Sequence, residues 1–158
     1  MSLQPTKPKA RKAKSNHSYK LIALASVLVL TSCSGGNKVA TECFELQEAI
    51  NANQPSFSTG TIDKAAETAK AQAEKDFENA LVAVQLSDTE LKEKRDRLVT
   101  LARESHTFSL QAADVMTEDG YLSGTAADDY RDITTKRMAT SEQLFAEQNG
   151  LQIHCSLQ

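Results

Sequence analysis

The residues of this chain that could do chemistry are its three cysteines and three histidines. His154 stands directly before Cys155, and His106 lies elsewhere in the chain, so a metal site or a thiol nucleophile has to be considered. Tetrahedral zinc needs four ligands at characteristic spacings, and two histidines without spaced partners do not supply them. Cys155 is better explained as one half of a disulfide. We therefore predict no metal site and no cofactor.

Residues 117–123, TEDGYLS, look like the middle of a calcium-binding EF-hand loop. With Gly120 at the invariant glycine position, the first ligand position falls on Val115 and the bidentate twelfth on Ala126. Neither side chain can ligate a cation. We interpret the segment as an acidic connector between two helices, with Gly120 as a helix C-cap.

Catalytic motifs are also missing from the sequence. It contains no glycine-rich phosphate loop, no nucleophile elbow and no HExxH. Acids are numerous, and neighbouring charges such as Glu74 with Lys75 and Glu93 with Arg97 favour exposed positions on solvated helix faces. These observations argue against an enzyme.

The N-terminal segment differs from the rest of the chain in charge and hydropathy. Six bases and no acid occur within residues 1–20: Lys7, Lys9, Arg11, Lys12, Lys14 and Lys20. The apolar run Leu21–Leu30 and the small residues before Cys33 follow. This order is typical of an export signal. The apolar run is about half of the roughly 20 residues that a membrane-spanning helix needs.

The residues Leu30-Thr31-Ser32-Cys33 resemble the lipobox of bacterial lipoproteins. The resemblance implies that residues 1–32 are a signal peptide, that the Cys33 thiol receives a diacylglyceryl group, and that Cys33 becomes the mature N-terminus. It also implies an exported, membrane-anchored protein on the periplasmic or outer-membrane side. Buried methylenes contribute about 0.8 kcal/mol each, so two or three acyl chains hold a protein durably. The alternative is a free, buried thiol at the end of a helix.

Removal of residues 1–32 changes the charge of the chain. The remaining 126 residues contain 12 Lys and Arg against 21 Asp and Glu, which gives a net charge of −9. Such a charge argues against nucleic-acid binding and against a position flat on anionic lipid. We predict a flexible tether over residues 33–40 and one domain over residues 41–158.

Cys43 and Cys155 remain after lipidation of Cys33. Export would bring them into an oxidising compartment, which favours one disulfide between them. The alternative is a pair of buried free thiols.

Four helices are predicted from apolar residues at steps of three and four. The first spans about 41–53, the second begins near Thr61, the third begins at Ser87 as the cap of a capping box with Glu90, and the fourth runs from Thr125 to Asn149-Gly150. The predicted fold is all-α, an up-down-up-down four-helix bundle or three long helices and a short one, closed by the disulfide. An even number of helices returns Cys155 to the end that holds Cys43.

The domain also loosely resembles small, uncharacterised exported helical proteins of cyanobacteria. The resemblance rests on Cys43 with Leu46, Ile50 and Asn51, on Leu86-Ser87-Asp88 with Leu91, and on the late cysteine. It implies a disulfide-closed helical bundle and brings no activity with it.

We expect a lipid-anchored interaction or accessory protein without catalysis; the alternative is a small-ligand or cofactor binder that uses the bundle interior. The anchor would turn the disulfide end toward the membrane and the two other connections away from it. A basic protein surface is the expected partner of that distal end, which carries Phe57, Asp119, Tyr121, Asp128 and Asp129. A solvated acidic end without a partner is the alternative.

Overall fold

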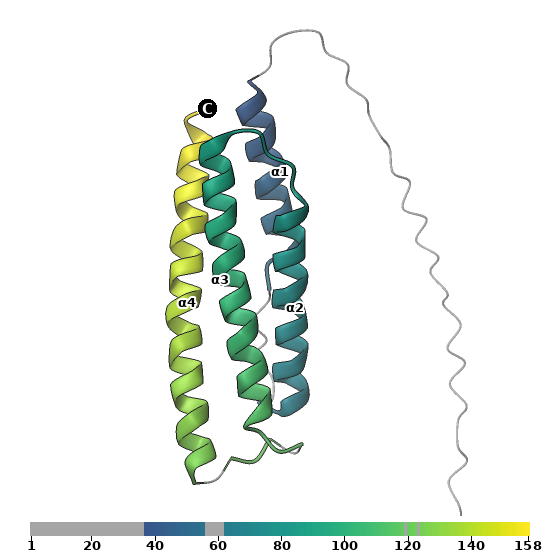
Figure 1. Ribbon diagram of the computed structural model, residues 1–158, viewed down its shortest axis with the longest axis vertical. Helices are drawn as coiled ribbons and strands as arrows, with labels where there is room; N and C mark the ends of the chain where they lie inside the picture. The colour runs from purple at the N-terminus through teal and green to yellow at the C-terminus, as the bar shows by residue number, and fades with distance from the viewer. Residues whose placement is uncertain (1–36, 56–61, 119, 123) are drawn as a thin grey trace, which may run out of the picture. The chain divides into compact units, whose positions relative to one another are not determined.

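A computed structural model describes residues 37–55, 62–118, 120–122 and 124–158. Within these ranges the chain forms four helices and no strand: α1 (Lys38–Asn53), α2 (Lys64–Ala83), α3 (Thr89–Asp114) and α4 (Thr125–Ser156). The helices alternate in direction, as Figure 1 shows. The predicted all-α bundle is confirmed. The predicted signal peptide, Cys33, Phe57 and Asp119 lie outside the described residues.

The predicted disulfide closes the bundle. Cys43 of α1 and Cys155 of α4 are bonded, with their Cα atoms 5.6 Å apart. This separation is ordinary for a disulfide. The bond joins the beginning of α1 to the end of α4, so it defines what we call the disulfide end of the bundle. The opposite end, where α3 is connected to α4, is the distal end.

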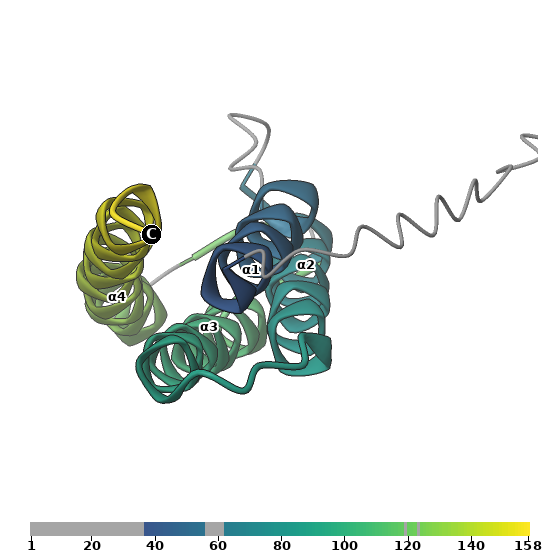
Figure 2. The ribbon, with the colours of Figure 1, turned by 90° about the horizontal axis from the view of Figure 1, so that it is seen from above.

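The helices differ greatly in length. At 1.5 Å per residue, the 16 residues of α1 span about 24 Å and the 32 residues of α4 span about 48 Å. Figure 2 shows α1 between α2 and α4, opposite α3. Because α1 is short, it occupies this place only in the half of the bundle next to the disulfide, as Figure 1 also shows.

The apolar core is concentrated in the half that α1 covers. Its buried members are Cys43, Leu46 and Ile50 of α1, Phe77 and Leu81 of α2, Leu91, Leu98, Val99 and Ala102 of α3, and Leu151 of α4. Toward the distal end, the buried side chains are mostly small or polar, among them Glu67, Ala71, Ser109 and Thr140, and Met116 is the large apolar exception among the described residues. The bundle therefore has an apolar half and a polar half.

Several predicted helix ends are wrong. The second helix, predicted to begin near Thr61, begins at Lys64 with Asp63 as its N-cap. The N-cap of α3 is Asp88, whose Oδ1 accepts a hydrogen bond from the backbone N–H of Leu91 at 2.9 Å, and not Ser87. The predicted first helix begins at Lys38, three residues early, because Asn37 caps it. α4 does not stop at Asn149-Gly150 but continues to Ser156.

The continuation of α4 through Gly150 has a physical reason. A glycine inside a helix costs about 1 kcal/mol relative to alanine. Beyond it, Leu151 is fully buried in the core and Cys155 forms the disulfide. Burial of a leucine contributes about 1.5–3 kcal/mol, which exceeds the cost of the glycine.

Gly120 lies in the connection between α3 and α4, six residues after α3 ends, and is not the predicted C-cap. Its φ is +76°, and a Cβ at this position would lie 2.6 Å from the backbone oxygen of Ile62. Only glycine fits such a position. The connection is therefore packed directly against the residues that precede α2. An ion pair from Lys64 to Glu118, at 3.1 Å, joins the same two segments.

Candidate functional site

One face of α2 carries buried carboxylates. Glu67, Glu74 and Glu78 are all buried, and Ala71 and Leu81 complete the same face at steps of three and four. The prediction that Glu74 is exposed is wrong. Each of these acids must therefore find its partners inside the bundle, because a buried charge without a partner is costly.

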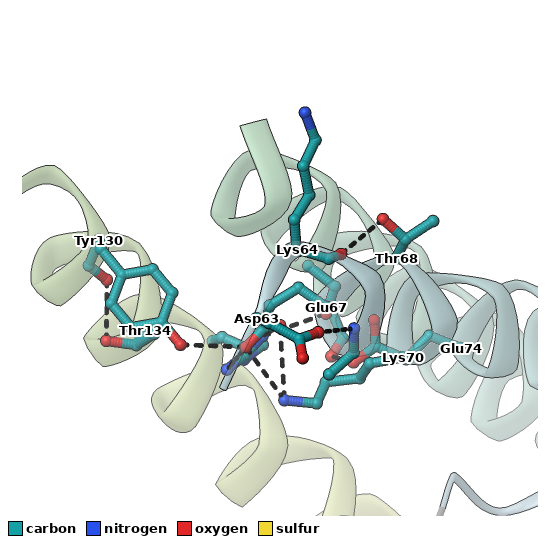
Figure 3. A network of polar contacts seen from close by, with 12 residues as sticks. Asp63, Lys64, Glu67, Thr68, Lys70, Glu74, Tyr130 and Thr134 are labelled. Carbon is teal, nitrogen blue, oxygen red and sulfur yellow. Dashed lines mark hydrogen bonds and ion pairs between the residues drawn. The ribbon is translucent and has the colours of Figure 1, made fainter. Parts of the chain in front are cut away.

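Glu67 joins α2 to α4 in the polar half. Its carboxylate accepts hydrogen bonds from Arg137, which pairs with both oxygens, and from the Tyr130 hydroxyl at 3.0 Å. Lys70 lies 3.4 Å from both oxygens. Figure 3 shows Tyr130 reaching from α4 toward Glu67, with Lys70 beside it. These long side chains bridge α2 and α4 where α1 no longer lies between them.

The pKa values in this cluster follow from its partners. Burial raises the pKa of the Glu67 carboxyl, but the hydrogen bond and charge of Arg137, the charge of Lys70 and the hydrogen bond from Tyr130 together outweigh it, so the pKa is lowered. Burial, together with the Glu67 charge, raises the pKa of Tyr130. Arg137 also donates to the Ser109 hydroxyl of α3 at 3.3 Å. The cluster thus connects three helices.

Glu78 is also fully paired. Lys75 donates to Oε2 at 2.8 Å, and Arg103 of α3 donates to Oε1 through Nε at 3.0 Å and Nη2 at 2.8 Å. Burial raises the pKa of Glu78, but these two bases together lower it. Glu78 therefore serves as a bridge between α2 and α3.

Glu74 differs from its neighbours on α2. Its Oε1 accepts a hydrogen bond from the Ser105 hydroxyl of α3 at 2.6 Å. Its Oε2 is buried and has no hydrogen-bond partner among the described residues. Of the three buried acids on this face, it is the one for which no ion pair is found among these residues.

A cavity of about 280 Å³ lies next to Glu74, between α2, α3 and α4 and beside the residues that follow α1. Its polar lining is Gln54, Glu74, Ser105, Ser141, Glu142 and Gln148, and its apolar lining is Pro55, Phe77, Ala102, Met138, Leu144 and Phe145. The cavity thus occupies the boundary between the apolar and polar halves of the bundle. The sequence did not predict it.

Glu42 holds the disulfide end together. Its buried carboxylate accepts hydrogen bonds from the backbone N–H groups of Asp88 and Ser87, both at 2.9 Å, and from the Ser87 hydroxyl at 2.5 Å. These bonds, led by the one from Asp88, lower the pKa of Glu42 to about 2. Because the folded pKa is depressed, the stabilisation is present above the ordinary pKa of 4.5 and is lost as the pH falls toward 2. Ser87 is occupied in this way, which explains why it does not cap α3.

The histidines make separate contacts. The ring nitrogen Nδ1 of His106 bonds to the carbonyl of Ala71 at 2.8 Å, and Nδ1 of His154 lies 3.0 Å from Glu90 Oε1. Within the described parts of the chain, no group of three or more His, Cys, Asp or Glu side chains could hold a metal ion.

The predicted partner residues that the structure describes are at the distal end. Tyr121, Asp128 and Asp129 are all exposed there. Asp128 pairs with Arg131 at 2.9 Å, and Asp129 lines a shallow hollow together with Asp114 and Asp132. Val115 and Ile133 form the apolar part of the same hollow. We call Asp114, Asp129, Asp132, Val115 and Ile133 the distal acidic surface.

No known protein family, curated protein or solved structure matches this chain. Among the described helices, none is both long and apolar enough to cross a membrane.

Proposed function

We propose that the protein is a lipid-anchored, extracytoplasmic helical bundle with a non-catalytic interaction role in the cell envelope. The lipobox-like residues that end at Cys33 support the anchor. The observation that supports the role most directly is the different character of the two ends of the bundle. The beginning of α1 and the disulfide are at one end, and the distal acidic surface is at the other.

The position of the beginning of α1 indicates how an anchor at Cys33 would orient the bundle relative to the membrane. Asn37, the first described residue, donates a hydrogen bond from Nδ2 to the carbonyl of Gln158 at 2.9 Å. It follows Cys33 by four positions, and an extended chain over that span reaches about 14 Å. An acylated Cys33 would therefore keep the disulfide end close to the membrane and turn the distal end away from it.

The distal acidic surface has the chemistry of a docking site for a basic protein. Three carboxylates surround two apolar side chains, and only Asp132 pairs with a base, Lys136 at 2.7 Å, among the described contacts. Interfaces commonly combine an apolar centre with charged groups that are complementary to the partner. Tyr121 is exposed at the same end and adds an aromatic group.

Replacement of Cys33 tests the anchor. We expect Cys33→Ser to remove the diacylglyceryl mass completely and to move the protein from the lipid-anchored fraction to an unprocessed or soluble form. Ser32→Ala is the matched control, because it keeps a small residue before the cysteine. Intact mass and membrane fractionation of exporting cells measure both results. A Cys33→Ser protein that stays membrane-bound with unchanged mass contradicts the anchor.

Replacement of three carboxylates tests the partner surface. Asp114→Asn, Asp129→Asn and Asp132→Asn together should weaken partner recovery about tenfold or more and reduce its salt sensitivity. Thermal stability should change little because all three side chains are exposed. The measurement is photo-crosslinking from position 133 in exporting cells, with the partner peptide identified by mass spectrometry and expected to be basic.

The matched control for charge is Glu45→Gln with Glu48→Gln and Glu93→Gln. These three acids are exposed and lie away from the distal acidic surface. Equal losses of crosslinking in the two triple variants would show a general effect of charge and would exclude the distal acidic surface as a specific docking site.

A further inference from the structure

Two of the three side chains that carry a buried polar atom without a partner among the described residues line the cavity. The two atoms are Glu74 Oε2 and Gln148 Nε2; the third atom belongs to His154, which is not in the lining. Buried polar atoms in proteins are almost always satisfied by a partner. An unsatisfied acceptor and an unsatisfied donor on two side chains of one cavity lining indicate a ligand that supplies the opposite groups.

The charge of the cavity indicates the kind of group that Glu74 would bind. Glu74 is 2% exposed, and among the described lining residues the only other ionisable side chain is a second acid, Glu142. The same residues include no Lys, Arg or His. On the same face of α2, Glu67 and Glu78 both pair with bases. Glu74 therefore lacks the basic partner that Glu67 and Glu78 have. The cavity beside it provides space for a cationic group.

The remaining lining indicates an apolar body for the ligand. Phe77 and Ala102 are buried in the core, while Met138 and Phe145 are 64% and 62% exposed although they are large and apolar. A ligand in the cavity could contact these two side chains and remove part of their apolar surface from water. Such pockets combine mostly apolar walls with a few polar groups that orient the ligand.

We propose that this cavity binds a small organic amine with an apolar body. Its ammonium group donates to the Glu74 carboxylate, its apolar group packs against Phe77 and Phe145, and an oxygen atom on the ligand, where present, accepts from the Gln148 side-chain amide. The volume of about 280 Å³ lies just below the usual range for ligand pockets, so the ligand is smaller than a typical drug. The proposal stands whether or not Cys33 carries a lipid.

The test compares 2-phenylethylamine with 2-phenylethanol, which has nearly the same shape and no charge. The full chain is titrated with each compound by calorimetry, in zwitterionic lipid nanodiscs if it is acylated and in buffer if it is not, and the matching protein-free sample provides the blank. We expect the amine to bind at least about tenfold more tightly than the alcohol. A smaller ratio, or no saturable binding of the amine up to about 10 mM, overturns the proposal.

Variants assign the effect to Glu74. Glu74→Gln should reduce amine affinity at least about tenfold and leave alcohol affinity within about twofold, since glutamine can still accept from Ser105. Glu48→Gln, the same change at an exposed position on α1, should leave both affinities unchanged. An unchanged amine affinity in Glu74→Gln overturns the proposal.

A second variant keeps the test decisive if Glu74→Gln does not fold. Phe145 is largely exposed, so Phe145→Ala should keep the fold and weaken both compounds by a similar factor of about three or more. Unchanged binding of both compounds in Phe145→Ala would place them outside this cavity and would also overturn the proposal.

Discussion

Removal of the disulfide should lower the free energy of unfolding by about 4–5 kcal/mol. Cys43 and Cys155 are separated by 112 positions, so the bond closes a loop that includes almost the whole bundle. In the chain-entropy account, such a loop greatly restricts the unfolded chain, and a loop of 100 residues corresponds to about 4.7 kcal/mol. The variant is Cys43→Ala with Cys155→Ala, and the measurement is denaturant unfolding of the full chain.

Cys33→Ser is the control for this prediction, because it removes the third thiol and keeps the bond between α1 and α4. Reductant should destabilise Cys33→Ser by the same amount as the double replacement destabilises the parent protein. A loss of less than about 1 kcal/mol in the double variant would contradict the chain-entropy account and would mean that residual structure already restricts the unfolded chain without the disulfide.

Replacement of Arg137 by alanine should cost about 3 kcal/mol of stability. Removal of one member of a buried ion pair typically costs 3–5 kcal/mol, since the remaining charge stays buried without its partner. Glu67 and Arg137 have side chains that are only 4% and 12% exposed. We expect the low end of the range because Lys70 and Tyr130 still contact Glu67.

Lys136→Ala is the matched control, since Lys136 is adjacent in sequence but pairs with Asp132 in solvent. Its cost should stay below about 1 kcal/mol. The pH profile gives a second measurement. The lowered pKa of Glu67 means that its stabilisation is present above the ordinary value of 4.5 and is lost as the pH falls below it. Arg137→Ala should therefore lose less stability than the parent protein on acidification below that value. Equal costs for Arg137→Ala and Lys136→Ala would contradict the role of Glu67 as a buried bridge.

The sequence was sufficient to predict the bundle and its closure. Apolar residues such as Leu46, Phe77 and Leu98 repeat at helical steps, and all are buried in the core. The pairing of Cys43 with Cys155 agreed with an even number of helices, and both are found. These features depend on local periodicity and on one covalent constraint, which a single sequence can reveal.

The candidate site could not be predicted in the same way. Glu67, Glu74 and Glu78 stand at helical steps with Leu81, so a signal for their shared buried face was present, but acids at such positions are usually solvated. The residue that makes burial of Glu67 favourable is Arg137, 70 positions away. The cavity depends in addition on the early end of α1. The local pattern of residue types predicts neither an ion-pair partner that is distant in sequence nor a cavity beside the end of a short helix.

The disulfide has a mechanical consequence for a protein held at both ends. If Cys33 is anchored in a membrane and a partner pulls on the distal acidic surface, tension enters α1 at its beginning and meets Cys43 within its first turns. The covalent bond then transmits the load to Cys155 and along α4, which runs without interruption to Thr125 at the distal end. The connections between α1, α2 and α3 are bypassed. Under tension, α4 would carry the load between the disulfide and the distal acidic surface, and α3 would share it at the distal end through Asp114 and Val115.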